Sequence, residues 1–376
     1  MARSFYERLI RSIFGATSSP ACCNFALQQT ARDNAANFSE QAVQAILQDV
    51  YMDDLLKSVE GVPKGIELAK ELVALTAMGG FRLHKWLSNA REVLAAIDSS
   101  ELAVREVDFD NDEVPNQRTL GMSWDLLQDI FVFHADPKET NMTKRGLVSI
   151  MCSVFDPCGY ITPFIFRAKC LVQDLWRAGL DWDQPLPDNL QHKWREWLRE
   201  LRELYDTVKI PRHHPGFSSQ AEDVQIHVFG DASESGFGAV AYLRYNVQGV
   251  IIVSFLSSKT RVAPLKTLSI PRLELQGSLL AARLGKLLET ELKVGIQRHV
   301  YWSDSEVVLK YLRNEVKRFK PFVANRVAEI RDLTQPEDWH HVPTDCNPAD
   351  LCSRGTTVAA LDPNSLWFQG PPFLRQ

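Results

Sequence analysis

Two sets of carboxylates in this sequence could do chemistry. The adjacent acids Asp53 and Asp54 lie between apolar runs in "LQDVYMDDLLKSV" (47–59). Such flanks are typical of a buried hairpin tip that holds a metal ion, and a surface loop does not need them. Transfer of a phosphoryl group by metal ions requires a further carboxylate beside such a pair. Whether this pair is catalytic therefore depends on its partners.

The second set is four acids placed at the ends of predicted elements. They are Asp231 at the end of a strand, Glu274 in a helix, Asp304 at the end of another strand and Asp350 in a short helix. A central sheet would bring them to one edge, where four carboxylates could not all stay ionised without cations. Two Mg²⁺ or Mn²⁺ ions about 4 Å apart would balance them and allow a water to attack a phosphodiester. Each acid alone is more often a cap or a helix-dipole partner, so the prediction rests on the set.

The first half of the chain mixes helix and strand signals. Apolar spacing predicts a helix over 39–48 with Ser39 as its N-cap, and another over 63–80 that Pro63 opens and Gly79-Gly80 closes. An acidic loop (108–119) and a strand pair (120–133) follow. Residues 136–210 are helical and rich in Trp, and 210–223 reads as a linker.

The pattern changes after the linker. Strands are predicted over 224–233, 236–244, 249–259, 298–305 and 338–344, and helices over 268–292, 305–315, 321–333 and 347–354. Leu273, Leu280, Leu284 and Leu287 mark the apolar face of the long helix, and Asn347 is the expected N-cap of the last one. Strands that alternate with helices indicate an α/β layer with parallel pairing after an antiparallel opening.

Composition sets the outer limits. The chain has 376 residues, 45% of them hydrophobic and 24% charged, as in an ordinary soluble protein of two or three domains. A net charge of -5 means that nucleic-acid binding would need local basic patches. Seven cysteines without a C-x-x-C pair favour reduced thiols inside a cell and argue against a zinc ribbon. No apolar run is long enough to span a bilayer, so no membrane partner is expected.

Residues 224–354 resemble a ribonuclease H domain, and the chain resembles the Pol polyprotein of BEL/Pao-type LTR retrotransposons. The similar stretches are "DASESGFGAVAYLR", "LSSKTRVAPLKTLSIPRLELQGSLLAARL", "YWSDSEVVLKYL" and "VPTDCNPADLCSRG". The resemblance implies that Asp231, Glu274, Asp304 and Asp350 hold the metal ions and that Ser305 touches the substrate backbone. Many ribonucleases H carry a mobile His before the last acid; the loop "TDCN" (344–347) has none, which implies slower product release.

The resemblance extends upstream to reverse transcriptases. "FGATSSPACCNFAL" (14–27) is similar to the template–nucleotide segment, "YMDD" (51–54) to the catalytic hairpin, and 79–89 and 119–125 to later palm motifs. The implied fold is α/β and α+β, a truncated palm and thumb followed by a ribonuclease H-like mixed sheet flanked by helices. The implied domains are a partial palm (1–135), a helical thumb or connection with linker (136–220), the ribonuclease H-like domain (221–356) and a tail toward integrase (357–376).

The polymerase site is expected to be incomplete. In the resembled family the further Asp lies well before "FGATSSP", where this chain has only about a dozen residues and no Asp. Asp33 and Asp49 come later, in sequence that reads as helix. We therefore predict that this chain alone does not act as an RNA-directed DNA polymerase.

Two further patterns have competing interpretations. Basic residues at 310–326, including Lys317, Arg318 and Lys320, could grip the phosphates of a hybrid duplex or form a solvated helix face. The cluster Trp176, Trp182, Trp194 and Trp197 could stack on bases, but helical spacing favours the core.

The leading hypothesis is an intracellular retroelement fragment, cytoplasmic or nuclear, that cleaves the RNA strand of RNA–DNA hybrids with Mg²⁺ or Mn²⁺. Its partners would be nucleic acid and other Pol products such as integrase. One alternative is a non-catalytic remnant or co-opted nucleic-acid-binding protein. Another is an aspartic peptidase, disfavoured because "GDASESG" lacks an Asp-Thr/Ser-Gly loop. A third is a full polymerase completed by a partner chain.

Overall fold

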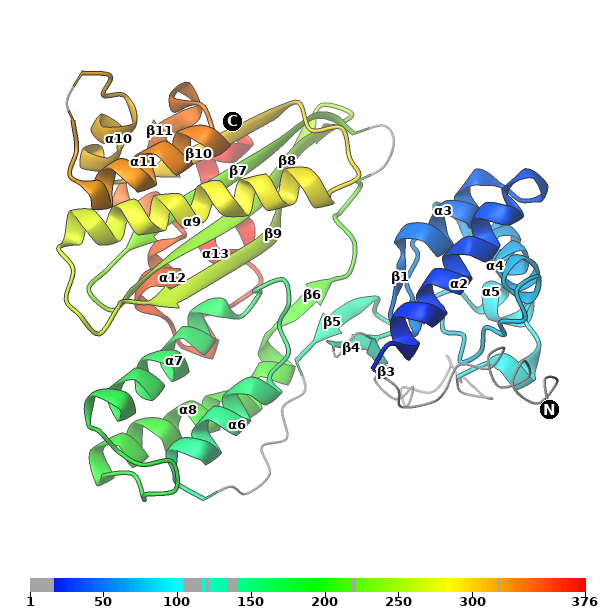
Figure 1. Ribbon diagram of the computed structural model, residues 1–376, viewed down its shortest axis with the longest axis horizontal. Coiled ribbons are helices and arrows are strands. Elements are labelled where there is room, and N and C mark those ends of the chain that lie inside the picture. The colour runs from blue at the N-terminus through cyan, green and yellow to red at the C-terminus, as the bar shows by residue number, and fades with distance from the viewer. Residues whose placement is uncertain (1–16, 104–116, 120–121, 134–140, 218–220, 317) are drawn as a thin grey trace, which may run out of the picture. The chain divides into compact units, whose positions relative to one another are not determined.

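A computed structural model describes residues 17–103, 117–119, 122–133, 141–217, 221–316 and 318–376 (Figure 1). The chain divides into two compact units, Met1–Leu120 with Trp124–Asp129, and Gly121–Ser123 with Ile130–Gln376. We call them unit 1 and unit 2. No helix in the described ranges is long and apolar enough to cross a membrane.

Unit 1 is built from helices around a small core. Its elements are α2 (Ser19–Asp33), α3 (Glu40–Gln48), β1 (Val50–Tyr51), β2 (Asp54–Leu55), α4 (Val62–Ala77), α5 (Arg91–Ala95) and β3 (Gln117–Thr119). The Ser39 hydroxyl accepts a hydrogen bond from the Ala42 N–H at 3.2 Å and caps α3, as the sequence predicted. Buried side chains of α3 and α4, such as Ile46 and Leu72, form the core.

Unit 2 is a mixed α/β domain. Its helices are α6 (Lys144–Ser153), α7 (Thr162–Arg177), α8 (Asp188–Thr207), α9 (Ile270–Glu291), α10 (Glu306–Leu312), α11 (Pro321–Leu333), α12 (Asp350–Arg354) and α13 (Leu366–Gln369). Its strands are β5 (Ile130–Val132), β6 (Lys209–Pro211), β7 (Glu222–Ala232), β8 (Gly236–Val247), β9 (Val250–Val262), β10 (Arg298–Ser303) and β11 (Trp339–His341), and β4 (Met122–Asp125) lies at the boundary between the units. The predicted strands and helices after the linker are confirmed.

A five-stranded sheet in the order β11-β10-β7-β8-β9 organises unit 2. Strands β7, β8 and β9 pair antiparallel, whereas β10 pairs parallel with both β7 and β11. The antiparallel opening followed by parallel pairing agrees with the sequence prediction. It also makes β7 the central strand, with parallel and antiparallel neighbours on its two sides.

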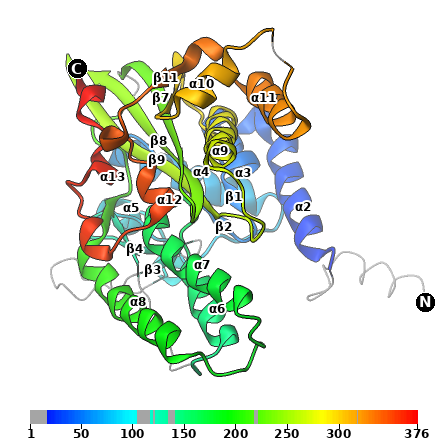
Figure 2. The same ribbon diagram turned by 90° about the vertical axis from the view of Figure 1, so that its left-hand side faces the viewer.

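Alternate residues of the central strands enter two separate cores. Val228 and Ala241 face the core under α9 and α11, while Phe229 and Val240 face the core formed with α7, α8, α12 and α13. This alternation follows from the two-residue period of a strand. Figure 2 shows α9 on one face of the sheet and α12 and α13 on the other. Both faces are therefore covered, as the apolar strand sequences require.

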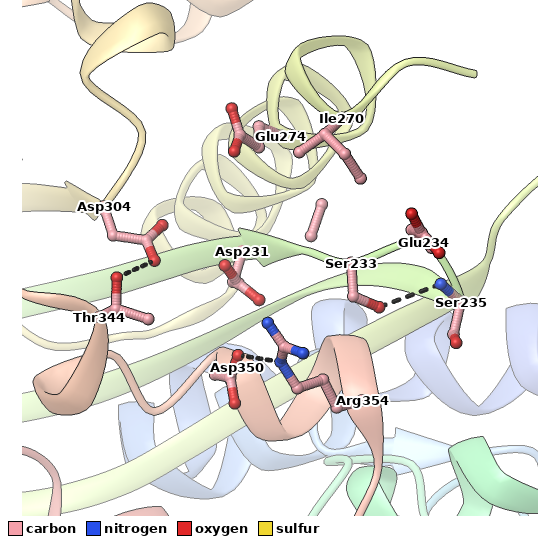
Figure 3. Close-up of a pocket in the computed structure, with 11 residues that line it drawn as sticks. Asp231, Ser233, Glu234, Ser235, Ile270, Glu274, Asp304, Thr344, Asp350 and Arg354 are labelled. Carbon is pink, nitrogen blue, oxygen red and sulfur yellow. Dashed lines mark hydrogen bonds and ion pairs between the residues drawn. The ribbon is translucent and has the colours of Figure 1, made fainter.

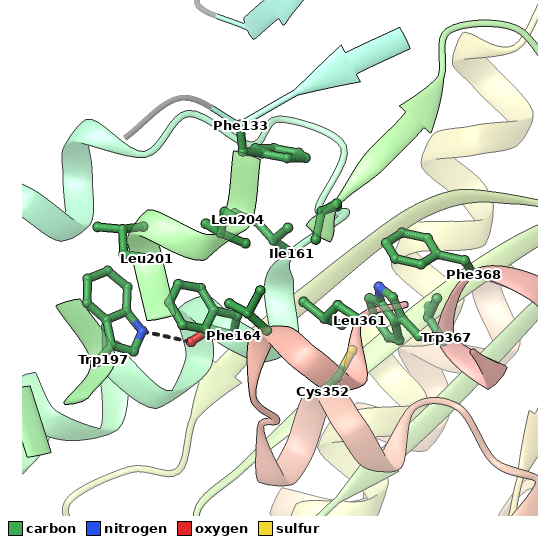
Figure 4. Close-up of a cluster of buried hydrophobic side chains, with 14 of the residues drawn as sticks. Phe133, Ile161, Phe164, Trp197, Leu201, Leu204, Cys352, Leu361, Trp367 and Phe368 are labelled. Carbon is green, nitrogen blue, oxygen red and sulfur yellow. Dashed lines mark hydrogen bonds between the residues drawn. The ribbon is translucent and has the colours of Figure 1, made fainter. Parts of the chain in front are cut away.

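Helices α7 and α8 share one core with the sheet and with residues after 357 (Figure 4). Trp197 is buried, stacks on Phe164 and donates its indole N–H to the Phe164 carbonyl at 3.1 Å. The Trp367 indole donates to the Tyr160 carbonyl at 2.7 Å, and the Tyr242 hydroxyl donates to the Trp367 carbonyl at 2.7 Å. Side chains of the segment that was interpreted as a tail toward integrase (357–376) thus pack against the sheet.

Some detailed predictions were wrong. Leu287 is 40% exposed, and Leu288 takes its place in the core because the helix turns past the predicted face. Trp176 and Trp182 are 51% and 43% exposed, so only Trp194 and Trp197 of the predicted cluster are core residues. The ammonium of Lys144 lies 3.8 Å from the centre of the Trp176 ring, which gives the exposed pair a cation–π contact.

Candidate functional site

The register of two parallel strands places Asp231 beside Asp304. Ser303 of β10 pairs with Gly230 of β7, and the next residue along each strand direction is an acid. Parallel strands end at the same edge of a sheet, so both carboxyl groups emerge there. Asp231 is 6% exposed and Asp304 is partly exposed.

A close approach of α9 to β7 brings Glu274 to the same edge. Gly277 lies against the backbone of Asp231, and a Cβ atom at Gly277 would come within 2.5 Å of the Asp231 carbonyl oxygen. A Cβ atom at Gly230 of β7 would in turn lie 2.9 Å from the Gly277 carbonyl oxygen. Glu274 is three residues before Gly277 in the same helix, so it lies on the same helix face, close to Asp231.

Asp350 reaches the site because α12 packs tightly on β8. A Cβ atom at Gly238 would overlap the Cβ of Cys352, which is buried. Asn347 was predicted to cap this helix, but α12 begins at Asp350 and Ala349 is its N-cap. The buried Asn347 amide instead donates to the Gly230 carbonyl at 3.3 Å and accepts from the Ala349 N–H at 3.1 Å. Asn347 thus connects the start of α12 to β7, the strand that carries Asp231.

The four acids line one open pocket with a volume of about 660 Å³ (Figure 3). Its wall is completed by residues 232–235, Ile270, Thr344 and Arg354. Figure 3 shows Glu274 on α9 across the pocket from Asp350 on α12, with Asp231 and Asp304 at the strand ends. Five of the lining side chains are acids, counting Glu234, and one is basic. This excess of negative charge favours the binding of cations in the pocket.

Each of the four carboxylates already has a hydrogen-bond partner within the chain. Thr344 donates to Asp304 at 3.0 Å, and Ser305 donates to Glu274 at 2.5 Å. In α12, Ser353 donates to Asp231 and the Arg354 Nε–H donates to Asp350 at 2.5 Å. Among the described residues, no three His, Cys, Asp or Glu side chains are grouped so that they could hold a metal ion as they stand.

Burial changes the acidity of Asp231. Desolvation is the largest cause, and together with the nearby charges of Asp304 and Asp350 it raises the pKa of Asp231 from 3.8 to about 7, against the lowering effect of the Ser353 hydrogen bond. The pKa of the Arg354 guanidinium is raised by its hydrogen bond to Asp350. A carboxyl group with a raised pKa at the bottom of an acidic pocket would be stabilised in its ionised form by a bound cation.

The donor set suits a hard divalent cation. All four acids offer carboxylate oxygens, which Mg²⁺ and Mn²⁺ prefer over the nitrogen and sulfur ligands typical of zinc. The residues present therefore fit these ions in chemistry, although the carboxylates would have to move together and give up some present partners. Asp231, Glu274, Asp304 and Asp350 are the side chains in place to hold them.

The remaining predicted site residues lie elsewhere or have other partners. Ser305 was expected to touch substrate, but it is buried, caps α10 by accepting from the Val308 N–H at 3.3 Å, and holds Glu274. Arg318 and Lys320 are exposed before α11, and Lys317 lies outside the described residues. None of the described ones lines the pocket.

The YMDD segment forms the expected hairpin in unit 1. Tyr51 pairs with Asp54 across a turn in which Met52 has a φ of 56°. Asp53 and Asp54 are both exposed, so the tip is not buried as its apolar flanks suggested. No group of three potential metal ligands includes them within the described ranges.

Sequence reasoning missed three side chains that contact the acids. Thr344, Ser353 and Arg354 hold Asp304, Asp231 and Asp350. The signal for two of them was present, because residues three and four after Asp350 in a helix lie beside it. Thr344 had no such local signal, since it meets Asp304 only through the parallel pairing of β10 and β11.

Part of the chain is similar to a known protein family. Residues 143–305 match the family model of the Pao retrotransposon-like RNaseH-like domain. The chain thus contains an RNase H-like domain of the retrotransposon type. The matched residues include Asp231, Glu274 and Asp304, and they also include helices α6–α8. No curated protein matches the chain.

Solved structures show more distant likenesses. The N-terminal RNase H domain of rv2228c from Mycobacterium tuberculosis is 14% identical, with a TM-score of 0.25, over 35% of this chain and 91% of that chain. RNase H1 from Halobacterium salinarum is 14% identical, with a TM-score of 0.24, over 34% and 89%. The foamy viral protease-reverse transcriptase is 13% identical, with a TM-score of 0.44, over 87% of this chain and 49% of that chain. The chemistry of this chain has to be inferred from its own residues.

Proposed function

We propose that unit 2 is a ribonuclease H-type endonuclease that cuts the RNA strand of RNA–DNA hybrids with Mg²⁺ or Mn²⁺. The observation that carries the proposal is the convergence of Asp231, Glu274, Asp304 and Asp350 on one pocket, from four elements far apart in the sequence. The match of residues 143–305 to a retrotransposon RNase H-like family supports it.

The four side chains have distinct roles in the proposed site. Asp231 is the most buried of the four and would hold a cation together with its neighbours Asp304 and Asp350. Glu274 approaches from the helix across the pocket. When bound, two divalent ions would neutralise these charges, acidify a water and stabilise the leaving oxygen. Glu274, Asp304 and Asp350 are partly exposed at the open mouth of the pocket, where the backbone of a nucleic acid would approach them.

Unit 1 is proposed to be a remnant of a reverse transcriptase palm. Its YMDD hairpin is formed, but Asp53 and Asp54 are exposed and lack a third acidic ligand among the described residues. We expect the purified chain to extend no primer on an RNA template. Extension would contradict this part of the proposal.

Phosphate contacts outside the pocket are proposed for Arg318, Lys320 and Lys317. The two described ones are exposed at the start of α11. Other members of the basic group are used internally: Arg313 donates to the Trp339 carbonyl at 3.1 Å, and Arg326 lies 3.6 Å from the centre of the Phe322 ring. Nucleic acid is the proposed partner inside the cell, and other Pol products remain a proposal from the sequence alone.

The test is cleavage of an end-labelled RNA annealed to DNA, with Mg²⁺ or Mn²⁺ added to the full chain. Asp304→Asn is the pocket variant, and Asp345→Asn is its matched control, because Asp345 is exposed nearby and does not line the pocket. Cleavage by wild type and by Asp345→Asn, with at least about a hundredfold loss in Asp304→Asn, is expected.

No cleavage by folded wild-type chain with either ion would overturn the nuclease. One observation favours the alternative of a non-catalytic nucleic-acid-binding protein, namely that each pocket acid is already paired within the chain. Binding of the hybrid without cleavage would favour that alternative.

A further inference from the structure

Arg354 is the only basic side chain among the described residues that line the pocket. It belongs to α12 and lies one turn after Asp350, to which its Nε–H donates at 2.5 Å. Figure 3 shows the guanidinium reaching from α12 toward Asp231, inside the ring of acids. Its side chain is 62% exposed, so it can leave this position without disturbing a core.

The contact occupies an oxygen of one of the four acids proposed to hold metal. Asp350 Oδ1 accepts the Arg354 N–H, and a carboxylate oxygen cannot serve a guanidinium and a metal ion fully at the same time. The other three acids are held by hydroxyl groups, which carry no charge. Among the residues that line the pocket, Arg354 is thus the one positively charged competitor of an entering cation, and the two compete for Asp350.

We propose that Arg354 is an internal counter-ion that competes with a divalent cation for Asp350 and, once displaced, binds a phosphate oxygen of the nucleic acid at the pocket mouth. The proposal rests on the proposed function. A displaced guanidinium would face cations on one side and a polyanion on the other. Pairing with a phosphate oxygen gives it a charge-assisted hydrogen bond in place of the one that it lost.

The simpler interpretation of the Arg354–Asp350 contact is an exposed ion pair on a helix surface, between residues spaced i, i+4. Arg177 provides a matched control for it, because its guanidinium contacts Asp174 at 3.3 Å within α7, is 50% exposed and does not line the pocket. If Arg354 were only such a pair, its removal would affect cation binding no more than removal of Arg177.

The first experiment is calorimetric titration of the full chain with Mn²⁺ in the absence of nucleic acid. Arg354→Ala should bind Mn²⁺ roughly two- to fivefold more tightly than wild type, because an exposed pair no longer has to be broken. Arg177→Ala should bind as wild type does. In the Asp350→Asn background, removal of Arg354 should leave the affinity unchanged, which separates a direct competition from a general field of the positive charge.

The second experiment measures KM and kcat for hybrid cleavage. Arg354→Ala should raise KM several-fold. Arg354→Lys should have a KM between those of wild type and Arg354→Ala, because lysine keeps the charge but lacks the fork of N–H donors. Unchanged Mn²⁺ affinity in a folded, active Arg354→Ala chain would overturn the competition. An unchanged KM would overturn the phosphate contact.

These outcomes are distinguishable from failure of the nuclease proposal. If wild type binds Mn²⁺ but cuts nothing, the proposed function and the phosphate contact fail, and calorimetry still decides the competition at Asp350. If neither wild type nor Arg354→Ala binds Mn²⁺, the metal site and the competition are both refuted.

Discussion

Gly277→Ala tests whether the close approach of α9 to β7 sets the position of Glu274. The added methyl carbon would lie 2.5 Å from the Asp231 carbonyl oxygen, whereas an ordinary contact begins near 3.4 Å. The helix would have to move away by about 0.9 Å, the difference between these distances. The obstacle is backbone of the central strand, which has neighbours on both sides and cannot yield.

Two opposing effects decide the stability of this variant. Overpacking a core contact costs about 1–3 kcal/mol, and the rigid backbone places this case toward the upper end. Replacing Gly by Ala inside a helix returns about 1 kcal/mol. We expect a net loss of roughly 1–2 kcal/mol, measured as a lower urea midpoint with an unchanged m value.

Activity should fall by more than this stability loss explains. A misplacement of about 1 Å in a positioned group can cost on the order of a hundredfold in rate. Gly285→Ala is the matched control, since it lies in the same helix and its methyl group would meet the hydroxyl end of Tyr301, far along the helix from Glu274. It should be destabilised and keep its kcat. Wild-type stability and cleavage in Gly277→Ala would refute the account of how α9 places Glu274.

Three other predictions concern unit 2. The folded chain favours protonated Asp231, whose pKa is about 7. The free energy of unfolding of the metal-free chain should therefore fall as pH rises from about 4 to 7. Urea titrations at each pH should show this fall in wild type and a flatter dependence in Asp231→Asn. Asn347→Ala leaves the Gly230 carbonyl without its buried donor and should cost about 1–3 kcal/mol, seen as a lower urea midpoint. Trp367→Ala should cost about 3–5 kcal/mol, against a much smaller effect of the half-exposed Trp182→Ala, and equal effects would contradict the packing of residues after 357.

The strands and helices of unit 2 after the linker were predicted well, because apolar alternation and helical spacing are signals carried by neighbouring residues. Strand alternation located β7 to β10, and the acids at strand ends followed from it. Their arrival at one pocket could be expected from the order of elements, since parallel strands end at one edge. The structure places all four around the pocket, while their roles stay predictions.

What failed depends on contacts between distant segments. Asn347 has the sequence signature of a helix cap, yet it binds the carbonyl of Gly230, more than a hundred residues away. Ser305 looked like a substrate contact because it follows Asp304, and only the packing of α9 reveals Glu274 as its partner. No sequence period carries such information.

The packing of residues after 357 has a consequence for how unit 2 folds. The hydrogen bond between the Trp367 indole and the Tyr160 carbonyl joins residues 207 positions apart, and the Tyr242 bond to Trp367 spans 125. Val358 similarly donates its N–H to Glu200, which is buried beside Arg167. Contacts of such long range are made only after large loops close, and they slow folding. On a ribosome, the apolar faces of α7, α8 and the sheet would stay partly uncovered until residues 358–374 had emerged.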